Sequence, residues 1–267
     1  RTSRSWSSTT PHPEVSFGYH GCFAYGNFLY TFGGQNSTGA TGNVYYAPFL
    51  AGGLIGAWST TTALPIASQY TAQVHDGVVW AMNWGNPSKT YFALINGDGT
   101  IGAWTETTAF ANTDRVGMAT ASWNGIVYLL GGRNAALFSY SDTQFARVNH
   151  HGTVGPWTTT TPTPGAARGY FRAESHNGTV YFTGGHDGAP RNDTRYAKQN
   201  PDGTLQAWQA GPNFATPRYF HGMAIWNGTL YITGGATVTG GNSATGDVSY
   251  AAINADGTPF GITLLAP

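Results

Sequence analysis

Residues 123–132 read Trp-Asn-Gly-Ile-Val-Tyr-Leu-Leu-Gly-Gly. Asn-Gly is a strong signal for a two-residue hairpin turn, because a type I′ turn needs positive φ at both central residues. The five residues after it are β-branched, aromatic or leucine, which favours a buried strand. The stretch therefore predicts a β-hairpin whose second strand ends at a glycine pair.

This stretch recurs along the chain. Close copies occupy 176–185 and 226–235, a looser copy occupies 25–34, and a degenerate copy at 75–84 has Asn83-Trp84 in place of the glycine pair. Self-similarity at a period of about 50 residues indicates a repeat architecture.

A second signal follows each copy. Residues 96–104 read Asn-Gly-Asp-Gly-Thr-Ile-Gly-Ala-Trp, with counterparts at 149–157 and 200–208 and outer copies at 50–58 and 254–262. Gly after Asp or Asn between β-prone runs again predicts a hairpin. Each repeat therefore contains four strands, A to D, which in the third repeat we expect at 117–122, 126–130, 143–148 and 154–160.

The chain divides into five such units, at roughly 16–65, 66–111, 112–164, 165–215 and 216–267. No window shows the apolar spacing of an amphipathic helix. Four antiparallel strands repeated radially form a β-propeller, in which few sheet edges are exposed. The predicted fold is all-β, a β-propeller of four-stranded antiparallel blades, with five blades.

The glycine pair and the downstream aromatics resemble the kelch repeat, and the resemblance covers nearly the whole chain. The pattern Asn-x-Asp-Gly-Thr-x-x-x-Trp is similar to the bacterial kelch-like variety. The resemblance implies a propeller fold and, at its arginines, contacts to loop carbonyls that brace neighbouring blades. It says little about function, because one fold hosts many functions.

Closure of the ring is a separate question. Residues 1–13 include Ser5-Trp6-Ser7-Ser8-Thr9-Thr10, which looks like another strand D. We expect residues 1–13 to close the fifth blade, with Trp6 in the slot where the last repeat has Ile262 and with Gly257–Pro267 as a departing strand. The alternative is that Trp6 ends a preceding blade of a larger ring.

Composition narrows the function classes. Charged residues make up 9% of the chain and the net charge is zero, whereas a nucleic-acid surface needs clustered Lys and Arg. No apolar run approaches the length of a membrane-spanning helix.

The single cysteine, Cys22, excludes an intramolecular disulfide framework. Low charge with many Gly and Thr favours an extracellular or surface-displayed protein. A start at Arg1 without Met indicates either a mature product or a fragment of something longer, and the fragment would be part of a larger polypeptide or assembly.

Candidate ligand-binding residues lie at one end of the predicted blades. The A–B and C–D turns share one end, whereas the B–C loops and D–A connections share the other, where lengths vary and function usually sits. We call this second end the loop face. Aligned positions near strand A give a candidate rim of arginine, histidine and tyrosine for an anionic or sugar-like ligand: Arg115, Arg168, Arg218, His20, His221 and Tyr70. Structural bracing by the arginines is the competing interpretation.

Two further candidates lie in individual repeats. Trp84 breaks the repeat on the loop face and is the candidate for stacking against a sugar. His186 and Asp187 lie in the most polar B–C loop, where they could contact a ligand, but two ligands without a third make a weak metal site. The tryptophans that recur once per strand D are expected to fill the gaps between blades. No metal or cofactor is indicated.

Asn36 and Asn192 begin Asn-x-Ser/Thr sequons in predicted loops and are candidate glycosylation sites. A catalytic constellation is not evident, because most acidic residues fall in turns. Glu174 and Asp114 are the two acids expected near strand A, where a sugar-active enzyme would need them.

The leading hypothesis is a non-catalytic extracellular binding or adhesion module whose partner at the loop face is a glycan or a surface protein. Two alternatives stay open: a structural domain of a filament, appendage or surface layer, and a sugar-active enzyme of the epimerase or glycosidase type.

Overall fold

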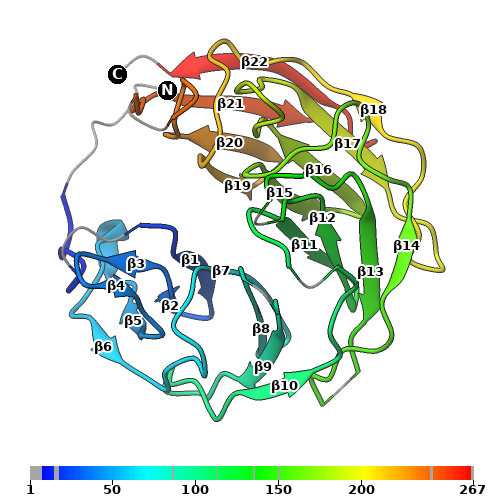
Figure 1. Cartoon of the computed structure of the whole chain (residues 1–267). Helices are drawn as coiled ribbons and strands as arrows, with labels where there is room; N and C mark the ends of the chain where they lie inside the picture. Colours follow the sequence, from blue (N-terminus) through cyan, green and yellow to red (C-terminus); the bar gives the residue numbers. More distant parts are fainter. Residues whose placement is uncertain are drawn as a thin grey trace. The chain divides into compact units, whose positions relative to one another are not determined.

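The computed structural model describes residues 8–14, 18–85, 87–112, 114–134, 136–149, 151–240 and 243–265. These residues form an all-β structure with five four-stranded antiparallel sheets in a propeller arrangement, as predicted (Figure 1). Each sheet is called a blade below, and its strands A to D follow one another in the chain.

Blade one consists of β1 (Gly21–Tyr25), β2 (Phe28–Phe32), β5 (Val44–Pro48) and β6 (Ser59–Thr60). Its loops add the two-stranded sheet β3 (Gln35–Asn36) and β4 (Gly39–Ala40) and the 3₁₀ turn η1 (Ala51–Gly53). Blade two consists of β7 (Tyr70–His75), β8 (Val78–Asn83), β9 (Thr90–Leu94) and β10 (Thr105–Thr107).

Blade three consists of β11 (Ala119–Trp123), β12 (Ile126–Leu130), β13 (Thr143–Arg147) and β14 (Thr158–Thr160). Blade four consists of β15 (Arg172–His176), β16 (Thr179–Thr183), β17 (Thr194–Lys198) and β18 (Gln209–Ala210). Blade five consists of β19 (Gly222–Trp226), β20 (Thr229–Thr233), β21 (Val248–Ile253) and β22 (Pro259–Leu265).

The chain forms two compact units. The first comprises residues 1–83 and 91–106, and the second comprises residues 84–90 and 107–267. Blades three, four and five therefore belong to the second unit. Within it the A strands are neighbours, because β15 contacts β11 and also β19.

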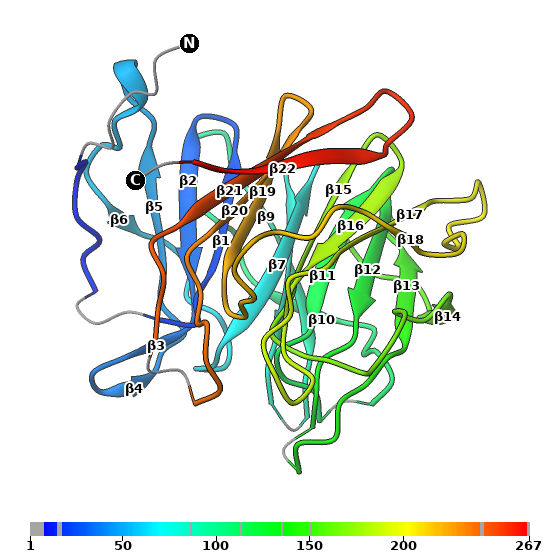
Figure 2. The same ribbon diagram turned by 90° about the horizontal axis from the view of Figure 1, so that it is seen from above.

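The predicted turns form for the expected reason. Asn124 and Gly125 have φ of 49° and 70°, and the corresponding pairs in blades four and five are also left-handed. The A–B hairpin of blade four, between β15 and β16, is visible in Figure 2 as two strands that run side by side. In blade three the second strand begins and ends as predicted, but β11 begins two residues late and β14 covers only the end of the expected strand D.

The glycine pair connects neighbouring blades. Gly132 N donates a 2.9 Å hydrogen bond to Arg168 O, and Gly185 N donates one of 3.0 Å to Arg218 O. A Cβ at Gly131 would lie 2.8 Å from Arg168 O, so a larger residue would push the blades apart. The pair is therefore required by close backbone approach and by positive φ.

The recurring tryptophans also connect blades. In the second unit, Trp157 Nε1 donates to Thr108 O at 2.9 Å, and Trp208 Nε1 donates to Thr161 O at 3.2 Å. In the first unit Trp104 Nε1 donates to Thr62 O at 3.0 Å in the same way. Each indole thus satisfies a carbonyl at the end of the preceding strand D, as expected of a residue that fills the gap between blades.

The fifth blade differs from the expectation. Its fourth strand is β22, which comes from the C-terminal segment that we expected to depart from the sheet. The pairing of β21 with β22 contains a register shift between Tyr250 and Ala252. Trp6 and the first seven residues lie outside the described residues, and the described Thr10 donates its hydroxyl to Ile55 O at 2.6 Å in blade one.

Within the described part of the chain, no helix has the length and hydrophobicity that a membrane crossing requires.

Candidate functional site

The predicted arginines are buried rather than open to solvent. Arg115 is 0% exposed, and its guanidinium forms two 2.9 Å hydrogen bonds to the two carboxylate oxygens of Asp142. Its Nη1 also donates to Gly131 O at 2.6 Å. This bidentate pair is a strong, geometrically specific contact, and it ties strand A to the glycine pair and to the start of strand C.

The same contacts recur in the next two blades. Arg168 Nη1 donates to Asp193 Oδ1 at 2.6 Å and to Gly184 O at 3.2 Å. Arg218 Nη1 donates to Gly234 O at 3.0 Å and to Asp247 O at 3.2 Å. Each guanidinium satisfies carbonyl groups that end a strand of its own blade, so these contacts are structural but lie within a blade, whereas the bracing interpretation placed them between neighbouring blades.

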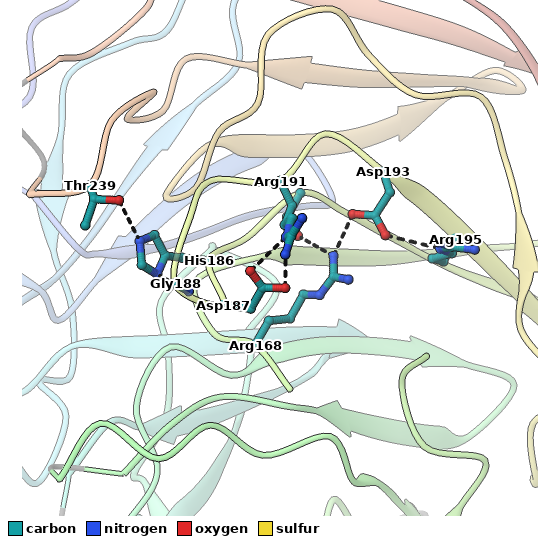
Figure 3. Close-up of polar contacts among 9 residues, drawn as sticks. Arg168, His186, Asp187, Gly188, Arg191, Asp193, Arg195 and Thr239 are labelled. Atoms are coloured by element: carbon teal, nitrogen blue, oxygen red, sulfur yellow. Dashed lines mark hydrogen bonds and ion pairs between the residues drawn. The ribbon is translucent and has the colours of Figure 1, made fainter. Parts of the chain in front are cut away.

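The B–C loop of blade four folds around its own ion pair. Asp187 accepts two hydrogen bonds from Arg191 Nε, at 2.7 and 2.8 Å, and the Asp187 side chain is 2% exposed. His186 Nε2 lies 3.2 Å from the hydroxyl of Thr239 in blade five (Figure 3). Burial and the nearby Arg133 lower the pKa of His186. No cluster of three or more metal-ligating side chains is present among the described residues.

Aromatic side chains gather beside this loop, at the start of the A strands. The Tyr170 ring lies 4.4 Å from Phe220 and 6.3 Å from Tyr219, measured between centroids. The Tyr219 ring lies 5.0 Å from His186. The guanidinium carbon of Arg133 lies 5.4 Å from the Tyr170 centroid. We call Tyr170, Tyr219 and Phe220 the aromatic ladder; Tyr170 and Phe220 are half-buried and Tyr219 is 5% exposed.

The backbone of the ladder is unusual. Tyr170 has φ of 60° and Phe220 has φ of 56°, a region that bulky residues rarely occupy. Gly117, at the corresponding position of blade three, has φ of 63°. Backbone bonds connect the three positions, since Tyr170 N donates to Gly117 O at 2.7 Å and Phe220 N donates to Tyr170 O at 3.0 Å. Glycine would adopt this conformation without strain, so the aromatic rings are retained against a local penalty.

The other predicted residues lie elsewhere. Trp84 is 6% exposed and its ring lies 6.1 Å from Tyr170, so its faces pack against protein instead of presenting a platform for stacking. His20 and Tyr70 belong to the first unit. Tyr70 is 2% exposed and donates to Ile66 O at 2.9 Å. The imidazole of His20 stacks on that of His12 at 6.5 Å between centroids.

His221 occupies a buried position between blades four and five. It is 1% exposed, and its Nε2 lies 2.8 Å from the hydroxyl of Thr183. Burial, with the charges of Arg172 and Arg218, lowers the pKa of His221 to about 3. The imidazole is therefore neutral at physiological pH.

The two candidate acids have different surroundings. Asp114 Oδ1 accepts a 2.8 Å hydrogen bond from the hydroxyl of Tyr140. The guanidinium carbon of Arg115 lies 4.2 Å from the centroid of the Tyr140 ring. Burial raises the pKa of Glu174 to about 7, although the charge of Arg172 opposes the shift.

Both candidate glycosylation sites are half-buried in the described residues, and their amide nitrogens already donate hydrogen bonds. Asn36 Nδ2 donates to Glu14 at 2.9 Å, and Asn192 Nδ2 donates to Phe214 O at 2.7 Å. A glycan on either nitrogen would replace that bond.

Three functional candidates escaped the sequence analysis: Tyr170, Phe220 and Arg172. Tyr170 lies one position before Phe171, and Phe220 lies one position before the predicted rim residue His221. The sequence signal for both was an aromatic residue in blades four and five where blade three has Gly117. Arg172 stands two residues before Glu174, at positions where blade three has two alanines.

Comparison with known proteins supports the fold. No protein-family model matches the chain. No curated protein matches it either. A solved structure described as that of YjhT superposes with a TM-score of 0.75 at 14% sequence identity, over 100% of this chain and 89% of that one. At this identity the similarity concerns the fold alone.

Proposed function

We propose that this chain is a non-catalytic, extracellular binding module of the kelch-like propeller type, and that it recognises a glycan at the loop face of blades four and five. The observation that carries the proposal is the aromatic ladder of Tyr170, Tyr219 and Phe220. The extracellular location rests on the low charge and the abundance of Gly and Thr in the sequence.

The chemistry of the ladder suits a sugar. Binding sites for small ligands combine aromatic surface with a few polar groups that fix orientation. Tyr170 and Phe220 provide half-buried rings, whereas Tyr219 has a packed ring and donates its hydroxyl to Val238 O at 3.1 Å. His186 beside the ladder and the Arg191 side chain, 48% exposed, add polar groups.

Retained strain is the second support. A left-handed conformation of a residue with a Cβ costs about 1–2 kcal/mol. Strained residues cluster at functional sites, where the surrounding structure holds them in place. Gly117 shows that the same backbone path forms with no side chain. The rings of Tyr170 and Phe220 are therefore expected to have a role beyond the path of the chain.

A glycan array probed with the full chain tests this function. We expect binding to a subset of neutral glycans, and Tyr170→Ala and Phe220→Ala are expected to weaken it at least about tenfold, because a stacked ring contributes roughly 1–2 kcal/mol. Trp226→Ala is the matched control, since this side chain is 76% exposed at the end of strand A opposite to the loop face. An array without signal, or equal loss in the control variant, would reject the proposal.

A protein partner is the second candidate, and a different loop favours it. Leu137 and Phe138, between β12 and β13, are 68% and 71% exposed. Large exposed apolar groups often mark interaction sites. Replacement of both residues by Ser is expected to abolish capture of a surface protein while glycan binding persists. Capture unaffected by this replacement would remove the second candidate.

A further inference from the structure

Blade four carries an ionisable pair where its neighbours have small residues. Arg172 and Glu174 lie on strand A, β15. The residues at the same distance from the A–B turn are Ala119 and Ala121 in blade three, and Gly222 and Ala224 in blade five. The repeat therefore needs no charge at these positions, and burial of charge is unfavourable without a compensating role.

The pair projects toward blade five. Phe171 and Ala173 belong to the apolar cluster that blade four shares with blade three. Because side chains alternate along a strand, Arg172 and Glu174 lie on the opposite face of β15. There the register places Arg172 beside Thr183, and Glu174 beside Tyr181, whose ring packs against Leu230 and Ile232 of blade five.

Neither member of the pair is fully hydrogen-bonded by the residues that the structure describes. The Arg172 guanidinium makes one long hydrogen bond, from Nη1 to Phe171 O at 3.5 Å. Over the described ranges, the Glu174 carboxyl accepts no hydrogen bond and forms no ion pair within 4.0 Å, and Arg172 acts on it only through its charge. His221 contacts Thr183 through Nε2, and its buried Nδ1 has no hydrogen-bond partner among the described residues.

Solvent nevertheless reaches the pair, because Arg172 and Glu174 are only half-buried. A guanidinium, a carboxyl group and an imidazole nitrogen with spare hydrogen-bonding capacity thus lie where blades four and five meet, and the charge of Arg172 acts on both Glu174 and His221. Unpaired polar groups in such a place are expected to have a ligand or a functional role.

We propose that Arg172 binds the carboxylate of a small organic acid, and that Glu174 in its protonated form donates a hydrogen bond to the same ligand. A guanidinium matches a carboxylate in a bidentate geometry. A protonated carboxyl group is a donor, whereas an ionised one would repel the ligand and compete for Arg172. The proposed site uses other side chains than the aromatic ladder, so its failure would leave the proposed glycan binding intact.

The proposal predicts that binding is coupled to proton uptake. Burial raises the pKa of Glu174 to about 7, and a bound anion next to it would raise that pKa further. Two other titratable groups near Glu174 are uncharged at neutral pH, because the pKa of His221 is about 3 and burial raises the pKa of Tyr181 to about 12. The neighbouring strands β11 and β19 contain no charged residue. His176 at the end of β15 and Arg218 beyond His221 complete the set.

Isothermal titration calorimetry on the full chain tests the site, with acetate, lactate and glucuronate as probes and glucose as the uncharged comparison. At about pH 6 at least one acid is expected to bind with a stoichiometry near one, whereas glucose gives no heat from this site. Between about pH 7 and pH 8.5 the affinity is expected to fall by up to tenfold per pH unit, because one proton is linked to binding. The three acids distinguish a simple acid, a hydroxy acid and a sugar acid as the natural class.

Variants separate the roles of the two side chains. Arg172→Met is expected to lose binding, and Glu174→Gln is expected to bind at about pH 6 but to lose the pH dependence, because an amide still donates and no longer ionises. Lys198→Met removes an exposed positive charge from the same blade and is expected to change nothing. Thermal unfolding of each variant identifies misfolding, and Arg172→Lys replaces Arg172→Met if the latter does not fold. Absence of saturable binding to the folded wild type, or binding equal in wild type and the Arg172 variant, would overturn the proposal.

Discussion

Blades three and four have the same framework but different A strands. In both, an arginine before strand A donates to the carbonyl of the first glycine of the pair and to an aspartate at the start of strand C. In both, a tyrosine of strand B donates its hydroxyl to a glycine carbonyl of the following blade, at 2.7 Å for Tyr128 and Tyr181. The arginine contacts connect segments of one blade, and the tyrosine contacts connect that blade to the next.

The difference lies in three positions near the start of strand A. Blade three has Gly117, Ala119 and Ala121, whereas blade four has Tyr170, Arg172 and Glu174. The framework contacts do not involve these side chains, so they can change without loss of the blade. The comparison teaches that bracing residues specify the fold, and that the adjacent positions on strand A are where one blade acquires a distinct chemistry.

The largest expected effect breaks the shared framework. Arg115→Met leaves Asp142 without its bidentate partner, and removal of one member of a buried pair typically costs about 3–5 kcal/mol. Arg168→Met is expected to cost less, because Asp193 keeps a 3.1 Å ion pair with Arg195. Denaturant unfolding of both variants, with Arg115→Met/Asp142→Asn as the double variant, measures the difference. Equal losses would show that Arg195 does not support Asp193.

An intermediate effect concerns the left-handed position. Gly117→Ala is expected to destabilise the protein by about 1–3 kcal/mol, because it combines unfavourable φ with a contact to the ring of Tyr170. A Cβ at Gly117 would lie 2.4 Å from Cδ1 of that ring.

Tyr170→Gly is the reciprocal change and is expected to alter stability little, because relief of strain offsets lost packing. Thermal melts of both single variants and of the double variant test this coupling. Additive effects in the double variant would contradict a direct contact.

The smallest expected effect concerns Glu174. Its folded pKa of about 7 lies above the value for an unfolded chain, so the folded state holds an extra proton between about pH 4.5 and pH 7. The contribution of this group to the free energy of unfolding is fully present below that pH range and is lost as the pH rises through it. The free energy of unfolding of Glu174→Gln, relative to that of the wild type, should therefore rise by about 1–2 kcal/mol between pH 5 and pH 8. This value is reduced to allow for the partial exposure of Glu174.

Unfolding curves at both pH values measure this gain. Glu106→Gln, at an exposed position on β10, is the control. A constant difference between Glu174→Gln and the wild type across the pH range would show that Glu174 ionises normally.

Much of the fold could be predicted from local patterns. Asn124-Gly125, the strand 126–130 and the glycine pair follow from short-range rules of turn geometry and strand composition, and the repeat supplies the rest of the blade. The strand that completes blade five could not be predicted in this way. Its segment, Pro259–Leu265, lacks the tryptophan of its counterparts and pairs with β21 through an irregular register.

The candidate site was harder to predict. Exposure of Arg115 or Trp84 depends on what the next segment of chain covers, and both are buried in the structure. The kelch resemblance supplied the bracing interpretation of the arginines, but alignment alone did not decide between bracing and ligand contact. The partners in question, Asp142 and Asp193, lie just before strand C of the same blade, 27 and 25 residues along the chain from their arginines.

The sequence by itself determined the repeat, the turns and the strand-rich class, because these depend on φ preferences and side-chain patterns within a few residues. Only the tertiary structure decided which polar side chains are already paired and which are left without a partner, as Glu174 is among the described residues. Pairing depends on distances between segments that are separated in the chain, and a linear pattern does not contain those distances.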